Sequence, residues 1–85
     1  MYVVRSSDEI DEQVAQLPHD GAARFAELCA ALELNPWSGE PYVRTDPYSA
    51  MRTHTFAAAS GDGFVVYTML EQDRLVDLLQ IIWFG

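Results

Sequence analysis

The spacing of apolar residues changes once along this chain, near residue 51, and this change limits the folds that it can adopt. Before it, apolar residues recur at helical intervals, with Ile10, Val14 and Leu17 at i, i+4 and i+7. From Met51 the interval is two, as in a strand with one buried face. Helices gathered before strands are typical of an α+β domain. With 85 residues, we expect residues 1–85 to form a single such domain.

The first part of the sequence predicts a short strand followed by two helices. After the β-type run 2–5, a capping box of Ser6 and Glu9 predicts a helix over 8–17, which a proline ends. A second helix is expected over 20–34, where an Asn-Pro pair stops it. Because the link between them is short, the two helices should form an antiparallel hairpin.

The second part predicts a three-stranded antiparallel meander. The strands are expected over 51–57, 64–71 and 75–83, with a glycine-rich turn at 60–63. A C-terminal helix over 75–84 is the competing interpretation of the last segment. The residues that we expect in the core are Leu28, Leu32, Val66 and Ile81.

The charge of the chain argues against a large nucleic-acid interface. Thirteen acidic residues, five arginines and no lysine give a net charge of −8, whereas nucleic-acid affinity comes largely from Lys and Arg on phosphates. The segment 41–60 is the exception, because it contains two arginines, Arg44 and Arg52, and one acidic residue, Asp46. His54 lies in the same segment.

Other function classes are disfavoured by the residues that the chain contains. Cys29 is the one cysteine, which fits a reducing compartment and an inert core thiol. The two histidines are isolated, so no metal-site spacing exists, and no glycine-rich phosphate loop indicates a nucleotide or other cofactor. The longest apolar stretch, 75–84, is too short to cross a bilayer. We therefore expect a cytoplasmic protein with no cofactor, no metal and no membrane contact.

Several short motifs carry a resemblance to a known family. Asn35-Pro36 ends the second helix, Ser38-Gly39-Glu40-Pro41 follows in the loop, and the strand segments 51–56 and 64–67 flank a glycine turn. In this order of elements the chain resembles the RelE/ParE toxin superfamily of type II toxin–antitoxin systems. The resemblance implies that superfamily's fold, and its RelE-type members are ribosome-dependent mRNA endonucleases.

The resemblance also implies a site. Arg52 and His54 match positions where RelE-type members present basic residues to RNA, so they are the candidate catalytic pair, a cation for the phosphate and an acid or base. Arg44 is a candidate phosphate contact, and Tyr67, which matches the tyrosine of the next strand, is a second candidate RNA contact. The simpler alternatives are a chance pair on a strand face, a solvated loop arginine and a core aromatic residue.

Two departures from the family's pattern predict weak or absent activity. Val65 stands where an arginine is expected, and residues 82–85 lack the basic end that usually closes the last strand. The chain is also acidic, whereas family toxins are generally basic. If active, it would be a metal-independent endoribonuclease with an antitoxin-like partner. The alternatives are a non-catalytic protein-binding module, whose acidic surface takes a basic partner, or a self-associating domain.

Overall fold

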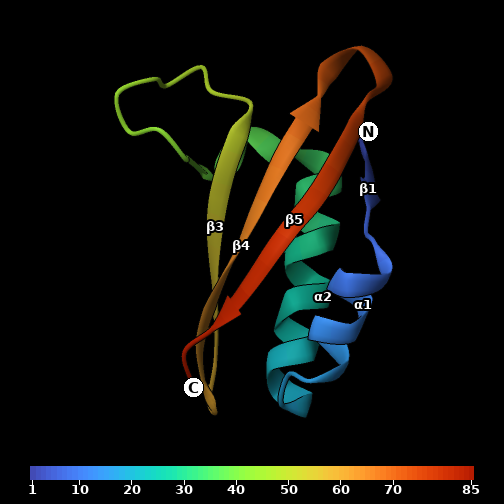
Figure 1. Ribbon diagram of the computed structural model, residues 1–85, viewed down its shortest axis with the longest axis vertical. Coiled ribbons are helices and arrows are strands. Elements are labelled where there is room, and N and C mark those ends of the chain that lie inside the picture. The colour runs from blue at the N-terminus through green and yellow to red at the C-terminus, as the bar shows by residue number, and fades with distance from the viewer.

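The structure, a computed structural model, describes all 85 residues as a sheet with two helices on one face (Figure 1). The sheet has the strand order β1-β5-β4-β3-β2. The elements are β1 (Val3–Arg5), α1 (Asp8–Ala15), α2 (His19–Leu34), β2 (Glu40–Pro41), β3 (Met51–Ala58), β4 (Gly61–Leu70) and β5 (Leu75–Trp83), with 3-10 turns η1 (Pro36–Ser38) and η2 (Glu71–Asp73). The predicted α+β class is confirmed.

Both predicted helices are present, and the first differs at its ends. The N-cap of α1 is Ser7, whose hydroxyl accepts from the Ile10 amide at 3.3 Å. The expectation that Ser6 caps the helix was wrong, because the Ser6 hydroxyl donates instead to Asp11 at 2.7 Å. The helix ends at Ala15 rather than at residue 17. Neither helix is long and apolar enough to span a membrane.

The meander is confirmed, but the sheet as a whole is mixed. Strands β3, β4 and β5 pair antiparallel, and the segment from Leu75 to Trp83 is a strand rather than a helix. The N-terminal strand β1 pairs parallel with β5, from Val3 opposite Leu75 onward. At the other edge, β2 pairs with only Arg52 and Thr53 of β3.

The turn between β3 and β4 is tighter than the glycine pattern predicted. Ala58 pairs with Gly61, so the connection is the two residues between them. Gly63 lies within the strand, where it is needed for packing. A Cβ there would lie 2.7 Å from the Ile82 carbonyl oxygen and 3.0 Å from the ring of Phe56. This glycine therefore marks a close approach of the β5 backbone and of an aromatic ring, and not a turn.

The hydrophobic core lies between the helices and one face of the sheet. Leu28, Leu32 and Ile81 are in it, as predicted. Val66 is buried too, but it lies on the opposite face, because its neighbours Val65 and Tyr67 point into the core. The full cluster is Tyr2, Ile10, Phe25, Leu28, Leu32, Phe56, Val65, Tyr67, Met69, Val76, Leu78 and Ile81.

Candidate functional site

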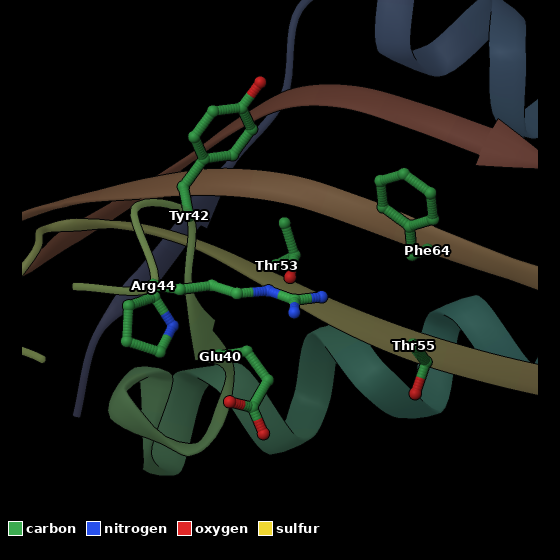
Figure 2. A pocket seen from close by; sticks show the side chains of 7 residues that line it. Glu40, Tyr42, Arg44, Thr53, Thr55 and Phe64 are labelled. Carbon is green, nitrogen blue, oxygen red and sulfur yellow. The ribbon is translucent and has the colours of Figure 1, made fainter. Parts of the chain in front are cut away.

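A hollow of about 620 Å³ opens on the face of the sheet that the helices leave bare. It lies where β2 and the loop after it meet β3 and β4. Figure 2 shows the side chains around it. Its lining consists of Glu40, Pro41, Tyr42, Arg44, Thr53, Thr55 and Phe64.

The alternation of β3 decides which residues reach this hollow. Thr53 and Thr55 point to the open face, since Arg52 and Phe56 point to the helical side. Phe64 stands opposite Thr55 in the register of β4. Its ring packs against Phe84 at a centroid distance of 5.7 Å. The floor of the hollow is thus two hydroxyl groups beside an aromatic ring.

Arg44 is the cation that faces the hollow. Its side chain reaches from the loop across the opening toward the sheet (Figure 2). It is exposed and forms no ion pair, since the two ion pairs of the protein are Arg5–Asp77 and Arg24–Glu27. Glu40 on the same wall opposes it in charge. The hollow therefore carries one positive and one negative side chain.

Arg52 is buried away from this hollow and is bound by backbone carbonyls. It is 6% exposed. Its Nε donates to Ser49 O at 3.1 Å, and its terminal nitrogens donate to the carbonyls of Gly39 at 2.8 Å and Pro47 at 2.5 Å. A longer bond of 3.4 Å reaches Trp37 O, and the guanidinium lies 4.6 Å from the centroid of the Trp37 ring.

These contacts make Arg52 the anchor of the segment that builds the hollow. The carbonyls come from both ends of the loop that carries Tyr42 and Arg44. Four donors are engaged, and a planar guanidinium is suited to such a fork. The catalytic role predicted for Arg52 stays a prediction. In this geometry Arg52 has little surface with which to meet a phosphate.

His54 lies at a second, smaller hollow that adjoins the first. This hollow, of about 130 Å³, shares Glu40, Thr53 and Thr55 with the larger one. The Nδ1 atom lies 2.8 Å from the carbonyl oxygen of Thr55. Because a carbonyl only accepts, Nδ1 carries the proton, and Nε2 is the nitrogen left for a ligand. His54 is half-buried, so of the predicted catalytic pair it is the more accessible member.

Tyr67 is enclosed by the protein. Its side chain is fully buried, and its hydroxyl donates to Pro36 O at 2.5 Å. Burial raises the pKa of this hydroxyl. A Cβ added at Gly39 would meet the same hydroxyl group, so the two residues are in close contact. The predicted RNA contact of Tyr67 has no exposed surface here, and the residue instead fixes the start of the loop.

The structure brings one of the four predicted site residues, Arg44, into the main hollow, and His54 lines the adjoining smaller one. The sequence reasoning missed Tyr42, Thr53, Thr55 and Phe64. A signal for two of them was present, because the alternation that put Arg52 and His54 on one face of β3 put both threonines on the other. What was missing was which of the two faces the helices cover.

The chemical capacity of this region is that of a small polar binding site. One cation, two hydroxyls and two aromatic rings can hold a phosphate and a flat base. His54 is the neighbouring group with a nitrogen suited to proton transfer. No group of three or more His, Cys, Asp or Glu side chains is placed to hold a metal ion.

Comparison with solved structures gives full-length matches to RelE proteins. The isolated Escherichia coli RelE toxin superimposes with a TM-score of 0.73 at 9% identity, covering 100% of this chain and 86% of that one. A mutant of the same toxin in the free state gives 0.71 at 10% identity, over 95% and 81%. A chain of the archaeal RelE–RelB complex from Pyrococcus horikoshii OT3 gives 0.71 at 19% identity, over 99% and 96%.

No protein-family model and no curated protein sequence matches this chain. At the identities above, the likeness concerns the fold and leaves the residues of the site to be judged on their own geometry. The protein has the fold of the RelE toxins over its whole length, as the sequence motifs suggested.

Proposed function

We propose that this protein is the toxin-like component of a type II toxin–antitoxin module, with weak or absent RNA cleavage. The observation that carries the proposal is the full-length match to RelE toxins, with all of this chain covered at a TM-score of 0.73. The polar hollow supports it, since Arg44, the threonines and the rings of Tyr42 and Phe64 suit a nucleotide.

The expected chemistry, where any remains, is metal-independent cleavage of RNA. Such cleavage needs a general acid or base that transfers protons. It also needs cations that stabilise the negative charge on the phosphate. His54 is the proposed acid or base, and Arg44 the proposed phosphate contact. Arg52 would contribute by holding the loop that carries Arg44. With one exposed cation and an opposing Glu40, stabilisation of the transition-state charge is small, which accounts for the weak activity proposed.

The proposed partner is an antitoxin-like protein, and the proposed setting is the cytoplasm. One of the matching chains comes from a RelE–RelB complex. Beyond Thr53 no strand pairs with the outer edge of β3, so an extended segment could add there. Self-association through the same edge is the alternative occupant, and a non-catalytic binding module remains the alternative function.

Expression in bacteria, followed by growth curves and mapping of mRNA cleavage sites, tests the proposal. We expect slight or no growth inhibition, and any cleavage lost in both His54→Ala and Arg44→Ala. His19→Ala is the matched control, because this exposed histidine lies at the start of α2, outside both hollows. Strong inhibition that persists in the His54→Ala/Arg44→Ala double variant would contradict the proposed site.

A further inference from the structure

A second surface feature lies on the helical side of the molecule, away from the proposed RNA site. It is a groove of about 420 Å³ between α1 and α2, where they meet β1 and β5. Seven of the ten residues that line it are hydrophobic. From α1 come Ile10 and Val14, and from α2 come Phe25, Ala26 and Cys29. This apolar groove contrasts with the polar hollow on the other face.

The rim of the groove is acidic. Asp11 of α1 and Glu33 of α2 both line it, one from each helix. The surrounding surface has the same sign, because the two helices carry seven carboxylates and one arginine. That arginine, Arg24, is paired with Glu27 at 3.0 Å. Arg5 of β1, next in sequence to the lining residues Val4 and Ser6, is paired with Asp77 at 2.6 Å. No unpaired cation therefore balances the acidic rim, which disfavours RNA and anionic lipid surfaces as occupants.

We propose that this groove binds a cationic amphipathic helix of another protein. The apolar floor would take side chains at i, i+3 or i+4, and i+7 of that helix. Lysines or arginines on either side of its apolar stripe would meet Asp11 and Glu33. Ala26 is exposed and small, so a partner helix can approach the backbone of α2 closely. The inference does not rest on RNA cleavage and applies equally to an inactive protein.

Cys29 gives a direct probe of the groove, since it lines the groove and is the only cysteine of the chain. Burial, with a further contribution from Glu33, raises the pKa of its thiol to about 11. Thiol-reactive reagents should therefore modify it slowly near neutral pH. A helix seated in the groove would cover it and slow the reaction further.

The test uses the full chain and three synthetic helical peptides. The first has a leucine stripe flanked by lysines, the second has glutamates in place of the lysines, and the third is a scrambled lysine peptide. Binding is measured by titration calorimetry, and the alkylation rate of Cys29 is measured with and without each peptide. We expect the first peptide alone to bind and to slow alkylation about tenfold or more, as for a site that is largely covered.

Two pairs of variants locate the binding. Ala26→Arg should abolish it, whereas Ala31→Arg, on an exposed part of α2 outside the groove, should leave it unchanged. Asp11→Asn/Glu33→Gln should weaken it about fivefold at low salt, from two rim charges. Glu12→Gln/Asp73→Asn makes the same charge change outside the groove. It should lower the logarithm of the peptide affinity by less than half as much as Asp11→Asn/Glu33→Gln.

Several outcomes would overturn the proposal. These are no binding of the leucine–lysine peptide to the wild-type chain, equal binding of the glutamate or scrambled peptide, and binding that Ala26→Arg leaves intact. Alkylation of Cys29 that slows as the protein alone is concentrated would show that a second copy of this chain occupies the groove instead. Circular dichroism of each variant establishes that the helices are retained.

Discussion

The two sides of the sheet use their charged residues in opposite ways. On the helical side, the carboxylates of α1 are exposed and form no ion pairs, and they surround an apolar groove. On the open side, one of the two arginines of the segment 41–60 reaches the surface. Arg52 points to the helical side and is bound by carbonyls, which leaves Arg44 to face Glu40.

This difference shows why charge counted along a sequence is a poor guide to charge on a surface. The segment 41–60 is the one with a positive count. One of its two arginines, Arg52, is buried, and its hydrogen bonds order a loop. The two helices, in contrast, keep five of their seven carboxylates exposed. The charge of this surface therefore favours a cationic protein segment over an RNA as the partner.

The largest effect on the stability of the fold is expected at Arg52. Arg52→Met keeps the length of the side chain but leaves the carbonyls of Gly39 and Pro47 without their donor. We expect it to lower the free energy of unfolding by roughly 2–3 kcal/mol, because buried acceptors lose their hydrogen bonds. Chemical denaturation measures this. Arg44→Met is the matched control and should change stability by less than about 0.5 kcal/mol, as for an exposed residue.

A change of similar kind is expected at Gly39. A Cβ there would lie 2.5 Å from the Thr53 carbonyl oxygen and would also collide with the Tyr67 hydroxyl. Neither group can move easily, since one is strand backbone and the other is buried. Gly39→Ala should therefore destabilise the fold by about 1–3 kcal/mol, the usual range for overpacking. A melting temperature equal to that of the wild type would mean that the loop and Tyr67 are not packed as described.

A smaller effect separates the two arginines in RNA binding. Arg44→Ala should reduce the slope of log affinity against log salt by about 0.7 for a single-stranded oligonucleotide, the value for one lost phosphate contact. Fluorescence anisotropy over a series of salt concentrations measures it. Arg24→Ala, on α2, is the control and should leave the slope unchanged. If both variants alter the slope equally, RNA binding is diffuse and the open-face site is misplaced.

The smallest expected effect is a pH dependence of stability from three carboxyl groups. Hydrogen bonds from Ser60 lower the pKa of Asp20, those from Tyr2 and Trp37 lower that of Glu71, and those from Arg5 lower that of Asp77. A folded-state pKa below the unfolded one means that the unfolded chain binds more protons as the medium is acidified. These groups thus stabilise the fold above about pH 4, and that contribution is lost as the pH falls through their folded values.

Substitution of Glu71 tests this sign. Thermal melts from about pH 6 down to about pH 3 span the range over which such carboxyls titrate. The Glu71→Gln variant should lose less stability on acidification than the wild type, because it lacks the carboxyl group whose pKa is lowered on folding. Asp62→Asn, at an exposed residue whose side chain forms no ion pair, serves as the comparison and should retain the wild-type dependence. Parallel curves for all three proteins would rule out the contribution of Glu71.

Most of the fold was predictable from the sequence, because its elements follow local patterns. Apolar spacing gave both helices, and alternation gave three strands. The parallel pairing of β1 with β5 was not predictable, since it joins Val3 to Leu75 across nearly the whole chain. Gly63 was misread because a glycine needed for ring packing has the same sequence signal as one needed for a turn.

The site was less predictable than the fold. Alternation correctly put Arg52 and His54 on one face of β3, but it does not say which face the helices cover. The carbonyl contacts of Arg52 involve residues 3 to 15 positions away in an irregular segment, and no periodic pattern encodes them. The groove between α1 and α2 likewise depends on how two short helices sit on the sheet.

Mapping of amide chemical shifts with a short single-stranded RNA tests the division between the two sides most directly. We expect small, salt-sensitive shifts at Tyr42, Arg44, Thr53 and Thr55, with none at the groove residues Val14 and Ala26. Shifts centred on α1 and α2, or no shifts at all on the open face of the sheet, would contradict it.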